Sequence, residues 1–163
     1  MTAAAGQAVL LRAEIDAVLA DWAYHLDHGQ LDDLAGLFTE DALFITGGVE
    51  LRGRVKIKNR YLERTVARTT RHTYSGLRVS VIGADPGAVR VADDGAARPV
   101  QVRAWSTWVN YAANAAAPVD DVGVYLVADF DDVLTWCADE RWRIRERRSI
   151  PVFRDIARAP ITG

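Results

Sequence analysis

The stretch VLLRAEIDAVLADWAYHL, residues 9–26, decides the N-terminal part of the fold. Apolar residues recur in it at helical spacing: Leu11, Ile15, Val18, Leu19, Trp22, Ala23 and Leu26. Polar residues fill most of the intervening positions, so the stretch predicts an amphipathic helix with one buried face. His28-Gly29-Gln30 interrupts this pattern, and Leu31 to Phe38 predicts a short second helix that meets the first near Asp27.

The sequence after this helical pair turns mainly to β-type runs. Ala42 to Thr46 and Val49 to Leu51 flank Gly47-Gly48, which favours a hairpin because both turn residues can take positive φ. Gly53 to Thr69 predicts a third helix. Turn clusters then separate five runs typical of strands: Thr73–Ile82, Ala88–Ala92, Pro99–Tyr111, Val122–Trp136 and Arg141–Val152.

This order of elements predicts an α+β fold. We expect three N-terminal helices packed in the concave face of one strongly curved antiparallel sheet, a cone-shaped α+β barrel. We expect one domain over residues 1–163, because no linker or internal repeat interrupts the chain. Helices that fill such a face only partly leave an apolar cavity, where a small-molecule site would lie. The five tryptophans and five tyrosines either line that cavity or fill the core.

Composition and charge argue against several classes of protein. The 20 basic and 22 acidic residues are mixed along most of the chain, so no broad positive field is available to bind nucleic acid. A single cysteine, Cys137, permits no intrachain disulfide and no cysteine-based metal site, which favours a reducing compartment. No stretch approaches the roughly 20 apolar residues of a membrane span, and we expect a cytoplasmic protein that binds no membrane.

Three histidines are the candidates for proton transfer. His25 and His28 lie at the end of the first predicted helix, where the helix dipole favours a capping role. His72 begins the first long strand run, where it can point along the mouth of the cone and titrate near neutral pH. Asp27 borders the buried face of the first helix and is the obvious partner for His72. Its alternative role is an N-cap on the second helix.

The last strand run supplies a further candidate. Alternation from Trp142 to Ile150 places Glu146 and Arg148 on the face whose ends are apolar, which should point inward. Buried charges need partners, so these two side chains pair with each other or with a neighbouring strand, or Arg148 anchors a carbonyl or carboxylate of a substrate. Asn110 is a similar, weaker candidate. The acidic run Asp129 to Asp132 is interpreted as a solvated strand or turn.

Several segments, in this order and spacing, resemble the SnoaL-like branch of the nuclear-transport-factor-like cone fold. They are Trp22 to Asp27, Leu34 to Ala42, Gly53-Arg54, Thr70 to His72 and Arg141 to Arg145. That branch includes scytalone dehydratase, bile-acid 7α-dehydratase, hexachlorocyclohexane dehydrochlorinase and polyketide cyclases, so a cyclase-type lyase is among the activities that the resemblance implies. The resemblance implies a cone that holds hydrophobic substrates without a cofactor or a metal.

The resemblance also implies roles for individual residues. Asp27 and His72 map onto a proton-transfer dyad, which implies a cofactor-free lyase or isomerase of the dehydratase type. We expect Trp22 and Tyr24 on the cavity wall, as substrate-binding residues together with Asn110 and Arg148. The chain departs from the dehydratase pattern at Trp22, where a tyrosine is common, and at Gly76, where an asparagine is common.

Two other functions fit the same fold. Small (beta) subunits of aromatic-ring hydroxylating dioxygenases share it, support a partner chain and catalyse nothing themselves. A small-molecule-binding protein without turnover is a third interpretation. The run Val122–Trp136 is apolar on both faces, with Val124, Leu126, Ala128 and Phe130 on one and Tyr125 and Val127 on the other. An uncovered apolar face favours association, so we expect a homodimer or higher homo-oligomer through the convex face of the sheet.

Overall fold

The described part of the chain forms three α-helices, eight strands and one short 3-10 helix, Ile156–Arg158. The structure is a computed structural model and describes residues 3–83, 89–91, 95 and 97–161. The helices are α1 (Ala3–Asp27), α2 (Leu31–Gly36) and α3 (Arg54–Leu62). The strands are β1 (Phe38–Thr46), β2 (Val49–Arg52), β3 (Thr69–Val81), β4 (Val89–Val91), β5 (Ala97–Pro99), β6 (Gln101–Ala113), β7 (Val124–Trp136) and β8 (Trp142–Arg154). The predicted α+β class is confirmed.

Six of the strands form one curved sheet in the order β2-β1-β8-β7-β6-β3, and the sheet does not close on itself. β1 and β8 run parallel, so the prediction of a sheet that is antiparallel throughout is wrong at this pair. The long connection between these two strands leaves their relative direction free, whereas a hairpin would have fixed it. β4 and β5 pair separately. The predicted strand Ala88–Ala92 lies partly outside the described residues.

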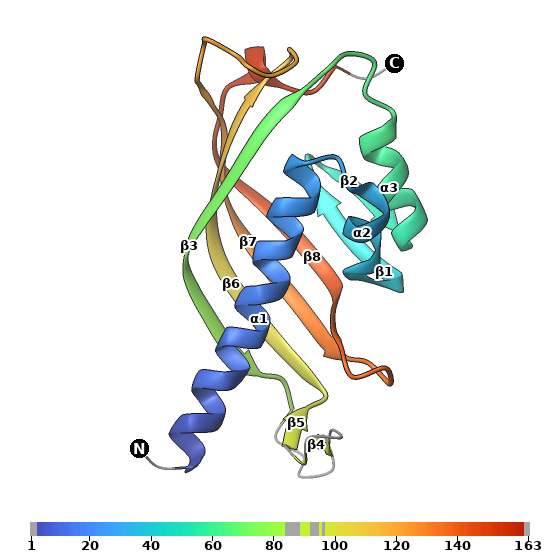
Figure 1. Cartoon of the computed structure of the whole chain (residues 1–163), viewed down its shortest axis with the longest axis vertical. Coiled ribbons are helices and arrows are strands. Elements are labelled where there is room, and N and C mark those ends of the chain that lie inside the picture. The colour runs from blue at the N-terminus through green and yellow to red at the C-terminus, as the bar shows by residue number, and fades with distance from the viewer. Residues whose placement is uncertain (1–2, 84–88, 92–94, 96, 162–163) are drawn as a thin grey trace.

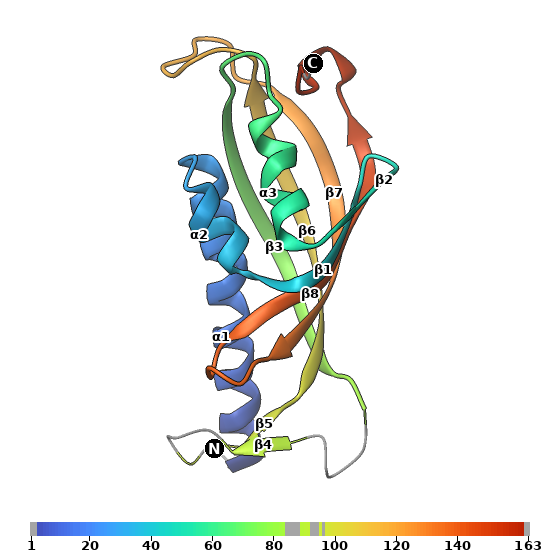
Figure 2. The ribbon, with the colours of Figure 1, turned by 90° about the vertical axis from the view of Figure 1, so that its right-hand side faces the viewer.

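The helices lie on the concave side of this sheet. Figure 1 shows α1 lying across the long strands, and Figure 2, turned by 90°, shows how strongly those strands curve. Two helices are shorter than predicted. α3 ends at Leu62, because the β-branched residues that follow lead into β3. α2 ends at Gly36, since the carbonyl of Leu37 accepts a hydrogen bond from the Ile144 amide of β8 at 2.8 Å.

The predicted hairpin is present between β1 and β2. Gly47 and Gly48 have φ of 58° and 81°, the left-handed values that a two-residue turn between twisted strands demands. α3 begins directly after this hairpin at Gly53, whose φ is 85°. The hairpin and α3 therefore follow each other closely at one end of the sheet.

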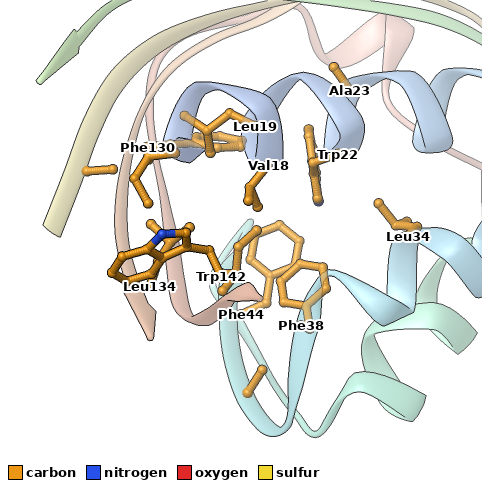
Figure 3. Packing of buried hydrophobic residues seen from close by; sticks show 14 of the residues in the cluster. Val18, Leu19, Trp22, Ala23, Leu34, Phe38, Phe44, Phe130, Leu134 and Trp142 are labelled. Atoms are coloured by element: carbon orange, nitrogen blue, oxygen red, sulfur yellow. The ribbon is translucent and has the colours of Figure 1, made fainter. Parts of the chain in front are cut away.

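The core lies between α1 and the concave face. Figure 3 shows Val18 and Trp22 of α1 pointing toward the aromatic rings of Phe38 and Phe44, and all four residues belong to the buried core. All but one of the residues predicted for the buried face of α1 are buried, and Leu11 packs partly buried against them. None of the helices among the described residues has both the length and the hydropathy that a transmembrane span needs.

Candidate active site

A cavity of about 170 Å³ lies on the concave side of the sheet. Its wall combines Trp22 of α1, Phe44 of β1, Tyr61 of α3, His72 of β3 and Phe130 of β7. Elements that are distant in sequence therefore meet around one space. Aromatic and aliphatic side chains supply much of the wall, as in most small-molecule sites.

Asp27 and His72 are joined at the edge of this cavity. The Asp27 Oδ1 and His72 Nδ1 atoms lie 2.6 Å apart, so the predicted contact is present. Asp27 is the last residue of α1, and its Oδ1 also accepts a hydrogen bond from the Thr70 hydroxyl at 2.7 Å. Its Oδ2 accepts from the His72 amide at 2.7 Å. The capping alternative is wrong, because α2 begins after Gln30 without a side-chain cap.

These bonds fix the charge of Asp27. Burial disfavours the carboxylate, but the hydrogen bonds and the charge of His72, with the bond from Thr70, outweigh it and lower the pKa of Asp27 below 3.8. An ionised carboxylate only accepts hydrogen bonds, so the proton of neutral His72 belongs on Nδ1. Nε2 then carries a free lone pair. The two side chains are 6% (His72) and 5% (Asp27) exposed, which shields this pair from water.

Trp22 and Asn110 also lie where the sequence placed them. The Trp22 ring packs edge-on against the His72 imidazole, with centroids 5.3 Å apart, and both line the cavity. Asn110 lies opposite His72 in the ladder between β3 and β6 and lines the same cavity. Its Oδ1 is buried and has no hydrogen-bond partner among the described residues, so it can accept a hydrogen bond from a ligand.

Tyr24 does not lie on the wall. Its side chain is 53% exposed and stacks on His28 at 4.2 Å. Tyr24 follows Trp22 by about 200° around the helix, so both cannot face the cavity. The other two histidines form hydrogen bonds at the C-terminal end of α1. His25 Nδ1 bonds the Gln30 side-chain oxygen, and His28 Nδ1 bonds the Tyr24 carbonyl.

Arg148 is also placed differently from the prediction. A β-bulge at Arg145 shifts the register of β8 between Ile144 and Glu146. Arg148 therefore points outward, 48% exposed, and pairs with Glu146 at 2.9 Å. The prediction that both face inward is wrong, and Arg148, expected to bind substrate, does not line the cavity. Pairing with each other, one of the alternatives for these two charges, is confirmed.

The bulge instead buries Arg147 beneath the cavity. Its guanidinium forms two hydrogen bonds of 2.8 Å with the Asp132 carboxylate, and both side chains are 0% exposed. Its central carbon lies 4.4 Å from the centroid of the Trp22 ring, close enough for a cation–π contact. The interpretation of Asp129–Asp132 as a solvated run is thus wrong for Asp132.

Sequence reasoning missed several wall residues. Tyr125 lies at a register shift of β7, so it and Leu126 both line the cavity rather than facing opposite sides. Arg60 of α3 also lines it, as do Arg64 and Arg68 of the segment between α3 and β3. The helix predicted for this segment ends at Leu62, so the four-residue spacing of these arginines does not explain why they meet at the cavity. Among the described residues, no three His, Cys, Asp or Glu side chains are grouped to hold a metal.

Comparison with models of protein families identifies the family of this chain. The model of the SnoaL-like domain matches residues 7–148. The chain belongs to the SnoaL-like domain family. The resemblance read from the sequence is therefore confirmed. A search of curated proteins finds no match to this SnoaL-like chain.

Solved structures share the fold of this SnoaL-like chain at low sequence identity. A candidate scytalone dehydratase from Novosphingobium aromaticivorans is 17% identical, with a TM-score of 0.73 over 98% of this chain and 95% of its own. ActVI-ORFA from Streptomyces coelicolor is 20% identical, with a TM-score of 0.66 over 85% and 95%. The beta subunit of a candidate aromatic-ring-hydroxylating dioxygenase from N. aromaticivorans is 16% identical, with a TM-score of 0.69 over 94% and 99%. These likenesses show the fold alone.

Proposed function

We propose that this protein is a cofactor-free lyase or isomerase that acts on a compact hydrophobic molecule. The observation that carries the proposal is the 2.6 Å contact between Asp27 and His72, with His72 on the cavity wall. A buried histidine whose tautomer is fixed by a carboxylate is suited to act as a general base. Low exposure of the pair supports the same role, because it protects the base from bulk water.

The proposed reaction begins when His72 Nε2 takes a proton from a carbon next to a carbonyl. The electron pair of the broken C–H bond forms a new C=C bond. In an elimination, a hydroxyl on the adjacent carbon departs with its bonding pair and takes up the proton from His72 to leave as water. In an isomerisation, His72 returns the proton to a different carbon. Asp27 stabilises the imidazolium formed in between.

The cavity limits the size of the substrate. Pockets for drug-sized ligands usually begin at about 300 Å³. The cavity here holds about 170 Å³, so we expect a ligand of one or two rings. Trp22 and Phe130 offer ring faces and edges against which such a ligand can pack.

Proton abstraction can be tested before the substrate is known. A panel of one- and two-ring β-hydroxy ketones would be incubated with the protein in D₂O and followed by NMR for solvent deuterium at the carbon next to the carbonyl. General-base help is worth about 10²- to 10⁴-fold, so His72→Ala and Asp27→Asn should each reduce the exchange by at least 10²-fold. His28→Ala is the matched control, since His28 is exposed and does not line the cavity.

The panel also separates the proposal from its alternatives. Exchange that depends on both Asp27 and His72 supports the enzyme. Absence of exchange across the panel, or exchange that survives His72→Ala, would overturn it. Tight binding without exchange would then indicate a binding protein. Absence of both binding and exchange would favour a supporting subunit of a larger enzyme, since a dioxygenase beta subunit shares this fold.

A further inference from the structure

The cavity wall carries several positive groups and no acidic one. Arg60, Arg64 and Arg68 line it beside His72, and no described residue of the lining is an aspartate or glutamate. Asp27 lies behind His72 and already accepts three hydrogen bonds. The surface that meets a ligand is therefore cationic at neutral pH. A hydrophobic neutral ligand alone gives no reason for this charge.

Arg64 and Arg68 differ from Arg60 in their partners. The Arg60 guanidinium lies 3.6 Å from the Glu63 carboxylate. The central guanidinium carbon of Arg64 lies 5.1 Å from the centroid of the Tyr61 ring. The charge of Asp27 acts on Arg64 and favours its charged form, but no described carboxylate forms an ion pair with it. An arginine above an aromatic face keeps its N–H edge free for an acceptor. The guanidinium N–H groups of Arg64 can therefore donate to an acceptor in the cavity.

Arg68 is held in place from one side. Its Nη1 donates to Asn114 Oδ1 at 2.6 Å and to the Arg158 carbonyl at 2.9 Å. Its central carbon lies 5.0 Å from the centroid of the Tyr125 ring. Its Nη2 is buried and has no partner among the described residues. Because buried donors are almost always satisfied in folded proteins, this nitrogen calls for an acceptor that the described chain does not supply.

The electrostatics of Arg64 and Arg68 favour the binding of an anion. Burial and the nearby charge of Arg64 lower the pKa of Arg68 to about 10. The pKa of Arg64 is also lowered, chiefly by burial. Two cations that are partly buried side by side repel each other and cost solvation energy. An anion between them would offset both penalties.

We propose that the ligand of this cavity carries a carboxylate, which binds to the guanidinium groups of Arg64 and Arg68. A carboxylate matches the planar donor edges of arginine, and its charge balances theirs. The rest of the ligand lies against Trp22 and Phe130, and its reacting carbon faces His72. This inference rests on the proposed function, because it names the substrate class of the same site as a compact, hydrophobic carboxylic acid.

The test compares an acid with its neutral counterpart of the same shape. Binding of 2-naphthoate and 2-naphthamide to the full chain would be measured by isothermal titration calorimetry. Hydrogen bonds to charged groups predict that the wild-type protein binds the acid at least about tenfold more tightly than the amide. Arg64→Met and Arg68→Met should each remove most of that preference, whereas Arg68→Lys should restore part of it.

Controls separate the carboxylate site from general effects of charge and folding. Arg141→Met makes the same change of charge at an exposed position after β7, outside the cavity lining, and should keep the preference. Arg64→Met preserves the bonds of Arg68 to Asn114 and Arg158, so it still tests the site if Arg68→Met fails to fold. Equal affinity for acid and amide, or no binding of the acid up to about 10 mM, would overturn the proposal.

The same titrations on His72→Ala distinguish the two proposals. A preference for the acid that survives in this variant supports the carboxylate site even where the exchange experiment fails. Loss of the preference in wild type, beside intact exchange of neutral ketones, would overturn the carboxylate site and leave the proposed reaction standing.

Discussion

The buried ion pair between Asp132 and Arg147 offers a test of the structure that needs no substrate. Asp132→Asn keeps the shape of the side chain but removes the charge that balances the Arg147 guanidinium, which is 0% exposed. Breaking a buried pair by removing one partner typically costs about 3–5 kcal/mol, because the other charge is left without compensation. For a chain of 163 residues this corresponds to a fall in Tm of about 6–20 °C.

The measurement is urea unfolding followed by tryptophan fluorescence, with calorimetry for the Tm. Asp131→Asn is the matched control on the next residue, where the partner Arg103 has a side chain that is 59% exposed. Exposed pairs contribute about 0–1 kcal/mol, so this variant should unfold close to the wild type. Replacing both members, as in Asp132→Leu with Arg147→Met, should recover much of the loss, since no charge then remains buried.

The difference in unfolding free energy between Asp132→Asn and Asp131→Asn decides whether the pair is buried. If Asp132→Asn unfolds within about 1 kcal/mol of Asp131→Asn, then Asp132 and Arg147 are not both buried as described. A double variant less stable than either single variant would show that the pair stabilises the fold beyond balancing its own charges.

Other expectations follow from single features. The pKa of Asp27 is lowered on folding, so its contribution to stability is present above pH 3.8 and is lost as the pH falls through its folded pKa. Urea unfolding should therefore give a larger free energy of unfolding for wild type than for Asp27→Asn at pH 6, and this difference should narrow below pH 3.8. A difference that widens in acid would contradict the lowered pKa of Asp27. Gly53→Ala should cost about 1–3 kcal/mol, because φ there is 85°, a backbone conformation that alanine rarely adopts. Gly36 has no such φ and an added Cβ would meet nothing within 4 Å, so Gly36→Ala should be neutral. Light scattering should report a homodimer, since Trp105, Ile150 and Val152 are 38%, 38% and 52% exposed; dissociation by Val152→Glu is expected, and a monomeric wild type would rule the dimer out.

The sequence was most informative where one local pattern determines the structure. The helical spacing from Leu11 to Leu26 identified the buried face of α1, and Gly47-Gly48 identified the hairpin turn. The approach of Asp27 to His72 was also predictable, because one residue ends a helix and the other begins a strand at the same end of the fold. The full set of bonds was not predictable, since the Thr70 hydroxyl and the His72 amide depend on how α1 docks.

The charges of β8 could not be assigned from alternation alone. Strict alternation groups Arg143, Arg145 and Arg147 on one face, and the bulge at Arg145 breaks that rule. The available signal was a conflict between charges across the hairpin. Without the bulge, the register of Trp136 with Trp142 would place Asp132 opposite Glu146, and like charges would meet in the core. One extra residue brings Arg147 there instead.

The bonds of Asp27 also link function to the order of folding. They join the end of α1 to residues 43 and 45 positions further along the chain, so the oriented base exists only once the first helix has docked on the third strand. In partly folded forms without this docking, Asp27 does not fix the tautomer of His72 and the imidazole is not buried. Recovery of the proposed proton exchange during refolding would therefore report one long-range docking event, separately from the formation of helix or sheet.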